Sequence, residues 1–400
     1  MRNIAVIGGG ASGLVSAIYA SKNNKVTIFE RNSNVGKKIL LTGAGKCNYY
    51  NSNQDLSNYN SNDKDLVKNI ITIENQNEII NFFDSIGIVP KIKNGYYYPK
   101  SGTSYSIREA LYKEAILNGV QIINDFKVTK IIKENNHFII NPDDENLLFD
   151  KIILATGSKA FPKTGSDGIG YDIVTKFGHH LIEPKPALVQ LIGEEKYFKD
   201  WAGIRCDVKV SLYEDNKFIK KEEGEIQLTN YGLSGICILN LSGRLKRGIN
   251  NHKEDIHINF LPFLNEKVDI WLDNRNKKLK NRNIIELLES LLNYKLLRII
   301  LKQSNIDFNS KWDELTSYKR DILINNLIDF KVKIKNTNSF DQAQVCSGGV
   351  KLSEIDTNTM ESNITKGLYI VGELLDVDGL CGGYNLTFAW ISGMIAGKSV

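Results

Sequence analysis

Short apolar runs separated by a glycine turn and a helical stretch open this chain. The first run covers residues 4–7, and a second run, KVTIF, ends at Glu30. Between them lie three consecutive glycines followed by an apolar-rich stretch of helix-forming length. Runs of four to eight apolar residues beside turn residues are typical of buried strands, and longer periodic stretches are typical of helices. The pattern predicts a strand–helix–strand unit.

A related pattern lies close to the C-terminus. The sequence LYIVGELLDVDGLCGGYNLTFAWISG contains an apolar run, a glycine-rich turn and a stretch long enough for a helix. Each pattern alone is common. Together they suggest that the two ends of the chain complete one site, where a flavin dinucleotide is held at one end by the N-terminal segment and at the other by the C-terminal segment.

The middle of the chain changes character twice, which predicts an α/β protein with an insertion. Residues 188–262 are β-rich, and residues 265–332 show apolar spacing near 3.6 and are predicted to be helical. The segments KVKIKN and QAQVCSGGVKL then return to strand patterns. We expect a discontinuous Rossmann-like domain from residues 1–187 and 336–400, a β-rich domain at 188–262 and a helical subdomain at 263–335. Within the first domain, helices are expected at 75–86 and 104–118, and strands at 120–124, 126–133, 137–141, 147–149 and 151–158.

The N-terminal turn has the spacing Gly8-x-Gly10-x-x-Gly13 directly after the first strand. Gly8 permits the tight turn, Gly10 lets the backbone approach a pyrophosphate at the helix N-terminus, and Gly13 permits close helix–strand packing. Glu30 stands where a carboxylate accepts hydrogen bonds from a ribose diol, which disfavours NADP in this slot. The flanking strand and helix make this a dinucleotide-binding fingerprint.

Composition excludes several classes of protein. Apolar residues make up 42% of the 400 residues, and no run approaches the ~18 continuous apolar residues of a membrane span. The net charge of +5 is small and dispersed, which disfavours a nucleic-acid partner. The five cysteines form no CxxC pair and the five histidines have no metal-ligand spacing, so no metal site is expected. The glycine-interrupted N-terminus does not fit a secretion signal, and we expect a cytoplasmic protein.

Several motifs together resemble one family. TGAGKCNYYN, GEIQLTNYGLSG and the C-terminal sequence quoted above are similar to the TGxGRCNxTN, GxxxxTxYGLSG and GLYxxGExLDVDGxxGGYNLxxAxxSG signatures of the BaiN/RdsA-type NAD(P)/FAD-dependent oxidoreductases, also labelled aminoacetone oxidase family FAD-binding enzymes. ATGS, PKTGSDGIGY and CSGGVKLSEIDTNTMES are also family-like, so the resemblance covers essentially the whole chain. It implies a two-dinucleotide-binding-fold flavoprotein with FAD, an inserted β-domain and a small helical domain.

The resemblance also implies which residues hold the cofactor. Gly382, Gly383 and Asn385 begin the last predicted helix, where backbone donors suit the pyrimidine oxygens of an isoalloxazine ring. The adenine end is expected at Gly8, Gly10, Ala11, Ser12, Gly13, Glu30, Arg31 and a backbone contact of Val128, with Ala155, Thr156 and Gly157 beside the dinucleotide. The flavin end is expected at Lys38, Thr42, Gly43, Lys46, Cys47, Asn48, Gly372, Glu373, Gly382, Gly383, Asn385 and Leu386.

Two positions depart from the family pattern. Lys46 replaces the usual arginine, which keeps the charge and loses the bidentate fork. Tyr49 and Tyr50 replace the Leu-Thr often found there. Both changes concern the wall that faces the substrate, and neither threatens FAD binding.

Some residues admit a chemical and a structural interpretation. Cys47 is a candidate redox thiol only in an accessible, electropositive setting. The run GYYYPKSG at 95–102 favours a half-buried strand over a lid above the substrate. NYGLSG at 230–235 favours a turn between strands, and Asp376 and Asp378 favour turn and cap roles over an acid–base pair. No catalytic residue is assigned.

The function expected from these observations is that of an FAD-dependent oxidoreductase. NAD(P)H is the expected transient co-substrate by resemblance, because the chain contains no second GxGxxG turn after a strand. The partner is expected to be a small organic molecule, without nucleic acid or membrane. An oxidase that uses O₂, and a flavin-bound protein without catalysis, remain alternatives.

Overall fold

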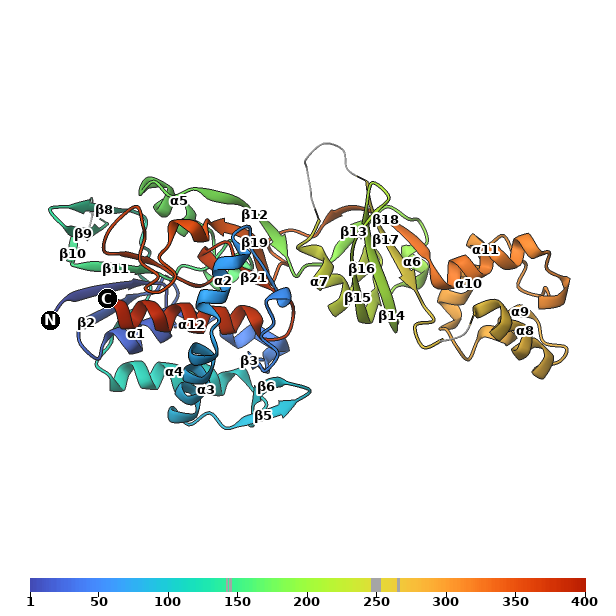
Figure 1. Cartoon of the computed structure of the whole chain (residues 1–400), viewed down its shortest axis with the longest axis horizontal. Coiled ribbons are helices and arrows are strands. Elements are labelled where there is room, and N and C mark those ends of the chain that lie inside the picture. Colours follow the sequence, from blue (N-terminus) through green and yellow to red (C-terminus); the bar gives the residue numbers. More distant parts are fainter. Residues whose placement is uncertain (142, 144–145, 246–252, 265–266) are drawn as a thin grey trace. The chain divides into compact units, whose positions relative to one another are not determined.

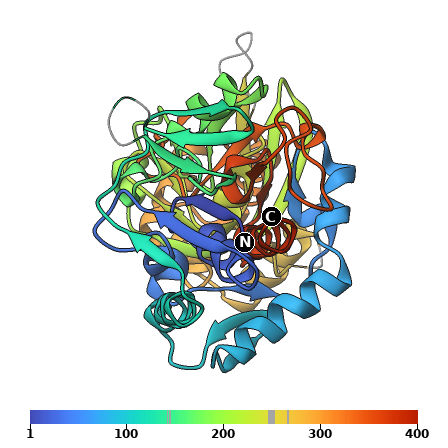
Figure 2. The same ribbon diagram turned by 90° about the vertical axis from the view of Figure 1, so that its left-hand side faces the viewer.

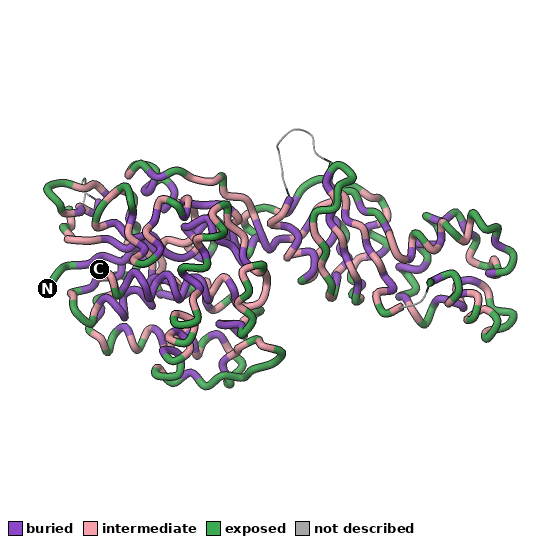
Figure 3. The backbone as a smooth tube through the Cα atoms, viewed as in Figure 1, coloured by how far each residue is buried: buried purple, intermediate pink, exposed green. Residues whose placement is uncertain are grey.

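The computed structural model describes the chain except residues 142, 144–145, 246–252 and 265–266, and it divides into two compact units. Unit 1 is Met1–Pro186 with Phe340–Val400, and unit 2 is Ala187–Ser339. Each unit has a hydrophobic core of its own, and the buried residues of both are seen in Figure 3. Because each core draws on one unit only, each has the packing of a domain.

Unit 1 is built on a five-stranded parallel sheet in the order β20-β11-β1-β2-β7 (Figure 1). β1 lies in the middle, so the strand order reverses between β1 and β11. Ligands of doubly wound sheets bind outside the carboxyl ends of the strands at this reversal. The predicted α/β class with a Rossmann-like domain is confirmed. The strands are β1 Asn3–Ile7, β2 Lys25–Phe29, β7 Gln121–Ile123, β11 Lys151–Leu154 and β20 Leu368–Ile370.

Two helices from opposite ends of the sequence, α1 (Ala11–Ala20) and α12 (Tyr384–Ser399), pack against each other, and both chain ends lie at this part of unit 1 (Figure 2). Gly393 and Gly397 lie one turn apart on α12. A β-carbon at Gly393 would stand 2.4 Å from the carbonyl oxygen of Ser12, and one at Gly397 would stand 2.5 Å from that of Ser16. The two backbones are therefore in contact, and only glycine permits this approach.

Smaller elements complete unit 1, and the helices predicted at 75–86 and 104–118 are present as α3 and α4. The helices are α2 Lys64–Ile70, α3 Ile73–Ser85, α4 Ser104–Leu117 and α5 Ile169–Lys176, with 3₁₀ turns η1 Ile39–Gly45, η2 Leu56–Asn58, η3 Pro162–Thr164, η5 Leu352–Glu354 and η6 Gly372–Leu374. The minor sheets are β3 Tyr50–Asn51 with β6 Tyr96–Pro99 and β5 Pro90–Lys93; β8 Ile131–Glu134 with β9 His137–Ile140 and β10 Leu147–Phe149; β12 Leu181–Ala187 with β19 Val345–Val350; and β4 Tyr59–Asn60 with β21 Asp378–Gly379.

The strand predicted over 126–133 is largely wrong, because only β8 forms there. The backbone N–H of Phe126 donates to the carbonyl oxygen of Glu30, at 2.9 Å. The N–H of Thr129 donates to the side chain of Asn141, at 3.0 Å. These two N–H groups bind loop residues and are not available for pairing with a strand, so the residues before β8 belong to no sheet.

Unit 2 contains a closed barrel in the strand order β13-β16-β15-β14-β17-β18, and the helices α8 to α11 lie along the chain between β17 and β18. β18 contains the predicted strand KVKIKN, and the helical stretch ends before the predicted residue 332. NYGLSG includes strand β16, so the turn predicted for it is wrong at those three residues. The strands are β13 Leu191–Gly193, β14 Arg205–Glu214, β15 Lys217–Leu228, β16 Gly232–Ser234, β17 Glu254–Asn259 and β18 Phe330–Thr337. The helices are α6 Phe198–Trp201, α7 Ile236–Ser242, α8 Val268–Lys278, α9 Ile284–Leu288, α10 Tyr294–Gln303 and α11 Ser317–Ile328, with the 3₁₀ turn η4 Trp312–Glu314.

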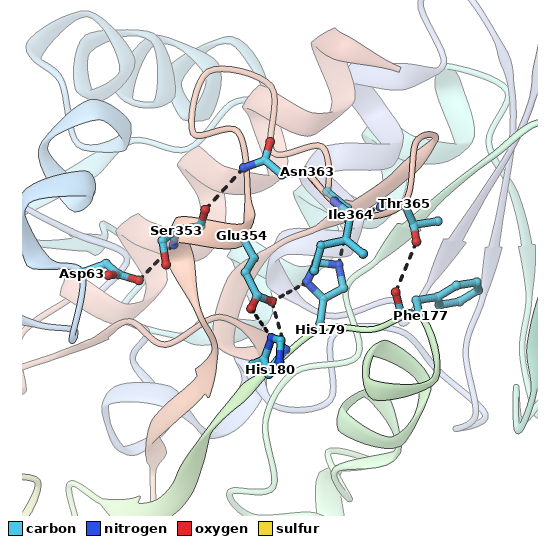
Figure 4. A network of polar contacts seen from close by, with 10 residues as sticks. Asp63, Phe177, His179, His180, Ser353, Glu354, Asn363, Ile364 and Thr365 are labelled. Carbon is cyan, nitrogen blue, oxygen red and sulfur yellow. Dashed lines mark hydrogen bonds and ion pairs between the residues drawn. The ribbon is translucent and has the colours of Figure 1, made fainter.

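A buried polar network fastens the loop after α5 to residues 353–365 (Figure 4). Nδ1 of His179 lies 3.0 Å from Oε2 of Glu354, and its Nε2 lies 2.8 Å from the hydroxyl of Ser362. His180 contacts the other Glu354 oxygen through Nδ1, at 2.7 Å. The side chain of His179 is fully buried, whereas that of His180 is 73% exposed. Glu354 thus joins two adjacent histidines in very different surroundings.

Candidate dinucleotide-binding site

The glycine turn after β1 leaves no room for larger residues at two positions. Gly8 has φ +100°, and a β-carbon there would lie 2.5 Å from the carbonyl oxygen of Ala155 at the end of β11. A β-carbon at Gly13 would lie 1.9 Å from the carbonyl oxygen of Gly8. The first turn of α1 is therefore pressed against the end of β1, at the reversal of strand order.

Gly10 differs from these two glycines because the protein itself does not require it. Its φ is −81°, which any residue adopts, and a β-carbon there would meet no described atom within 4 Å. Gly10 is the N-cap of α1, where no side chain caps the helix and no acidic residue lies in the first turn. Uncapped N–H groups with open space before them form an anion site. These observations fit a pyrophosphate beside Gly10, Ala11 and Ser12.

Glu30, the residue expected to bind a ribose, also holds the glycine turn in place. Its Oε2 accepts the backbone N–H of Gly9, at 2.9 Å, and its Oε1 accepts the N–H of Asn32, at 2.8 Å. The side chain is 6% exposed. Oε1 also accepts from Nδ2 of Asn32, at 2.6 Å, so the lone pair left to accept a ribose hydroxyl is on Oε2.

The neighbouring Arg31 contacts the glycine-rich segment PKTGSDGIGY. Its guanidinium pairs with Asp167 and donates to the carbonyl oxygen of Gly165, at 3.2 Å. Burial acts to raise the pKa of Asp167, but hydrogen bonds from Arg31 and the Ile169 N–H, together with nearby positive charge, outweigh it and the pKa is lowered. Val128 is buried and lies two residues after Phe126, whose N–H binds the Glu30 carbonyl. Arg31 and Val128 thus both lie close to Glu30, as an adenosine site requires.

The residues after the carboxyl ends of β11 and β20 form the other side of the candidate site, against the glycine turn after β1 and the start of α1. Ala155 continues β11 by donating its N–H to Ile7, at 2.9 Å, and Thr156 and Gly157 follow it. After β20, a β-carbon at Gly372 would lie 2.6 Å from the hydroxyl of Ser12. The two chain ends therefore meet here, through Ser12 on α1 and Gly372 after β20.

Lys38 and Glu373 form an ion pair that crosses between the two chain ends. Nζ of Lys38 lies 2.6 Å from Oε2 of Glu373, and the hydroxyl of Ser158 donates to the same oxygen, at 3.2 Å. Both charged side chains are at least three-quarters buried. The pair joins the loop after β2 to η6, so both predicted residues lie together beside the glycine turns. Ser158 was missed as a site residue, although it belongs to the quoted ATGS motif.

The loop containing TGAGKCN adopts strained backbone conformations. Gly43 and Ala44 have φ of +56° and +53°, and Cys47 has φ of +54°. Left-handed conformations at non-glycine residues persist where the surroundings enforce them, often at functional sites. Thr42 to Lys46 are at least partly exposed, and Asn48 and the residues after it are buried. The glycine turn of this loop is therefore accessible, and the buried residues that follow it hold it in place.

Cys47 does not have the surroundings of a redox thiol. It is fully buried, and burial raises its pKa to about 12. Since the thiolate is the reactive form, we expect Cys47 of the folded protein to resist iodoacetamide at pH ~7.5 while the partly exposed Cys381 is alkylated. Peptide mapping by mass spectrometry checks this, with guanidinium-unfolded protein as the control in which both react. Rapid alkylation of folded Cys47 would restore the redox interpretation.

A buried acceptor faces the start of α12. Oδ1 of Asn48 has no hydrogen-bond partner among the described residues, although Asn48 is only 9% exposed. A β-carbon at Gly383, the N-cap of α12, would lie 3.1 Å from this oxygen. An unpaired buried amide oxygen costs ~1–3 kcal/mol. The N3–H of a flavin pyrimidine is a donor of the kind this oxygen lacks, and the uncapped N–H groups of α12 suit the neighbouring ring oxygens.

The side chain of Asn385 and the carbonyl group of Gly382 form hydrogen bonds within the protein. The Asn385 side chain accepts the N–H of Gly379 and donates to its carbonyl oxygen, both at 2.8 Å. It is therefore used to hold the preceding turn, and a contribution to a bound ring falls to its backbone and that of Leu386. Gly382 is held by Asn51, whose Nδ2 donates to its carbonyl oxygen at 3.0 Å. Asn51 was missed, although it is the last residue of the motif TGAGKCNYYN.

Asp376 and Asp378 are held by backbone and amide groups. Asp376 accepts the N–H of Asn62, at 2.9 Å, and burial raises its pKa to about 6. Asp378 lies in β21 and accepts from Nδ2 of Asn60, at 3.1 Å. In the part of the chain that the structure describes, no cluster of three or more His, Cys, Asp or Glu residues could hold a metal ion. No helix among the described residues is long and apolar enough to cross a membrane.

Comparison with known proteins gives three full-length similarities. The family model described as HI0933-like protein Rossmann domain matches residues 2–399. The chain is 37% identical over 404 residues to the 3-dehydro-bile acid delta(4,6)-reductase of Clostridium scindens, covering 100% of this chain and 99% of the relative. It is 28% identical over 407 residues to the ribosomal RNA dihydrouridine synthase of Haemophilus influenzae, covering 99% and 97%.

The fold is also found among solved structures. The 3-ketosteroid-delta4-(5alpha)-dehydrogenase of Rhodococcus jostii RHA1, in complex with 4-androstene-3,17-dione, is similar with a TM-score of 0.50 at 13% identity, covering 100% of this chain and 96% of that chain. At this identity the similarity concerns the fold alone.

Proposed function

Because the chain belongs to the HI0933-like family of FAD-dependent oxidoreductases, we propose that it binds FAD across the two glycine turns of unit 1 and passes electrons from NAD(P)H to an organic substrate. The observation that carries the proposal is the pairing of two sites that the protein leaves incomplete. Gly10 stands before open space at an uncapped helix, and Asn48 presents a buried, unpaired oxygen beside a second uncapped helix.

Different residues of unit 1 would bind different parts of the cofactor. FAD, when bound, supplies a flavin N5 that accepts or donates a hydride. The N–H groups at the start of α1 bind the pyrophosphate, and Glu30 accepts a ribose hydroxyl. The N-terminus of α12 stabilises negative charge at the pyrimidine end. The Lys38–Glu373 pair fixes the strand ends between these two regions.

The substrate class proposed is an unsaturated carbonyl compound. The relative at 37% identity is named a delta(4,6)-reductase and the relative at 28% a dihydrouridine synthase. Dihydrouridine arises by saturating a pyrimidine double bond conjugated to a carbonyl group, so both names describe reduction of a carbon–carbon double bond. We propose the same reaction type here, with a small molecule as the substrate.

A second candidate is reduction of a base in ribosomal RNA, as the names of the Haemophilus influenzae and Escherichia coli relatives indicate. The expectation of no nucleic-acid partner rested on the small net charge of +5. Mass analysis of ribosomal RNA from cells with and without the gene separates the two candidates, because only the second predicts a lost dihydrouridine. The cytoplasm, where all five thiols stay reduced, is the proposed location.

The first test is an anaerobic titration of the purified protein with NADH and with NADPH, following flavin absorbance near ~450 nm. Loss of the band with one nucleotide supports a reductase. A yellow protein that neither nucleotide bleaches contradicts the NAD(P)H part of the proposal and favours the oxidase or non-catalytic alternatives. A colourless protein that cannot be reconstituted with FAD contradicts the whole proposal.

Replacing Gly10 by alanine separates cofactor binding from folding. The new methyl group meets no described protein atom within 4 Å, so we expect an unchanged unfolding midpoint of the apoprotein. A pyrophosphate in the same space would collide with the methyl group, so FAD affinity should fall by roughly 100-fold, comparable to losing one or two charge-assisted hydrogen bonds. Fluorescence titration of apoprotein with FAD measures this. Unchanged FAD affinity would place the pyrophosphate elsewhere.

A further inference from the structure

The hairpin of β5 and β6 presents a tyrosine to the start of α12. Side chains along β6 alternate between two faces, as in any strand. Tyr97 points inward, where its ring packs edge-on against Tyr50 at 5.1 Å and against Tyr49 at 6.1 Å. Tyr96 therefore lies on the opposite face, and it is 36% exposed. The inward tyrosine anchors the hairpin and fixes where the outward one stands.

Tyr96 touches the glycine turn proposed to hold the flavin end. A β-carbon at Gly382 would lie 2.8 Å from Cε1 of Tyr96 and 3.2 Å from Cε2 of Tyr384. Gly382 therefore lies between two tyrosine rings, with φ +132°. Asn51, which is directly opposite Tyr96 in the β3–β6 pairing, donates to the Gly382 carbonyl oxygen. The hairpin and the turn before α12 thus form one wall.

The hydroxyl of Tyr96 has no task within the described structure. No described residue forms a hydrogen bond with it, whereas the hydroxyl of Tyr50 in the same cluster donates to Gln76, at 3.1 Å. Packing against Gly382 requires only the ring. A phenol beside the cofactor site that offers a free donor is suited to a polar atom of a ligand.

We propose that Tyr96 is a substrate-binding residue, whose hydroxyl donates a hydrogen bond to the carbonyl oxygen of an unsaturated ketone and whose ring covers the substrate beside Gly382. The hydrogen bond would draw electron density toward the oxygen and so favour addition of the hydride, which reduced FAD would supply, to the far carbon of the conjugated double bond. A proton from water would add to the near carbon and complete the saturated ketone. This inference rests on the proposed function and names the group that recognises the substrate class.

The test compares Tyr96→Phe, which removes only the hydroxyl, with Tyr96→Ala, which also removes the ring. Tyr105→Phe is the matched control, because Tyr105 is 54% exposed on α4 and belongs to no part of the proposed site. The probe is the planar enone 4-androstene-3,17-dione. Its binding to the oxidised holoenzyme is followed as a change in the flavin spectrum, and its reaction is followed as reoxidation of dithionite-reduced flavin.

We expect the dissociation constant for the enone to rise about 3–10-fold in Tyr96→Phe, the value of one neutral hydrogen bond, and further in Tyr96→Ala. Reoxidation by the enone should slow by at least ~10-fold in Tyr96→Phe, because polarisation is lost in the transition state. Reoxidation by ferricyanide, which needs no carbonyl contact, should be unchanged, as should FAD content. Tyr105→Phe should match the wild type throughout.

Two results would overturn the inference. One is a Tyr96→Phe enzyme that binds and reduces the enone like the wild type, and the other is a wild-type flavin spectrum that the enone does not change. Because dithionite replaces the nucleotide, the Tyr96 experiment is independent of NAD(P)H. Failure of both nucleotides to bleach the flavin would therefore count against the NAD(P)H part of the proposed function. A wild-type enzyme that does not bind the enone would count against the proposed substrate class, and a Tyr96→Phe enzyme that behaves like the wild type would count against Tyr96 alone.

Discussion

Replacing Gly393 by leucine is expected to lower the free energy of unfolding by about 3 kcal/mol or more, with loss of FAD from the purified protein. The β-carbon of the new side chain would stand 2.4 Å from the carbonyl oxygen of Ser12. This oxygen belongs to the backbone of α1, so it cannot turn aside as a flexible side chain would. α1 cannot withdraw, because Gly13 is already pressed against Gly8. α12 must therefore move away, and the hydrogen bond from the N–H of Gly372 to the hydroxyl of Ser392 on α12 is then lost.

Chemical denaturation and the ratio of flavin to protein absorbance measure this effect. Gly10→Ala, compared with the wild type as apoprotein, is the stability control, since it adds a side chain to the same α1 region without a protein contact. A Gly393→Leu protein that unfolds at the wild-type midpoint would show that α1 and α12 are not in the backbone contact described here. A stable protein that merely binds FAD less tightly would confine the effect to the cofactor site.

The sequence predicted the parts of this fold that rest on local signals. A glycine is needed at Gly8 and Gly13 for steric reasons, and Glu30 closes a strand, so one short window contains the strand, the turn and the acid together. The same is true of the glycine turn before α12. Local spacing is enough where the physical requirement is local.

Pairings between distant residues were not predictable in this way. Strand β18 closes the barrel by pairing with β13 and β17, and nothing in KVKIKN says which strands it will join. Asn385 matches the family motif, yet its side chain holds Gly379. The burial of Cys47 depends on the packing of the whole unit, so the sequence left its chemistry open.

The second large effect expected is a loss of stability in acid that originates at His179. Burial lowers the pKa of His179 below its usual 6.5, although the hydrogen bond to Glu354 acts to raise it. Burial acts to raise the pKa of Glu354, but hydrogen bonds from His180 and His179 outweigh it and the pKa is lowered. The folded state thus contains a neutral imidazole joined to a carboxylate and to Ser362 (Figure 4).

The sign follows from which state binds the proton. Below pH 6.5 the unfolded chain protonates His179 while the folded chain does not, so protons favour unfolding. The stabilisation is fully present above pH 6.5 and is lost as the pH falls toward the folded pKa, with a slope of up to about 1.4 kcal/mol per pH unit. Glu354 acts in the same direction from about pH 4.5 downward. A proton on Nε2 would also compete with the two backbone N–H groups that Ser362 accepts, those of Ile364 and Thr365.

The adjacent histidines provide matched variants. His179→Gln keeps a donor and an acceptor but cannot titrate, so its unfolding free energy should be about 1–2 kcal/mol lower at pH ~7.5 and should lack the fall toward acid that His179 causes. What remains between pH ~5 and ~6.5 includes the opposite contribution of Asp376, whose pKa of about 6 makes protons favour folding. His180→Gln should keep the wild-type slope, because the exposed ring leaves His179 buried. The temperature of flavin release, measured by fluorescence across this pH range, reports on unit 1. If His179→Gln retains the wild-type slope, another group sets the acid lability. If both variants flatten it, the slope does not come from the protonation of His179 alone but depends on both rings that contact Glu354.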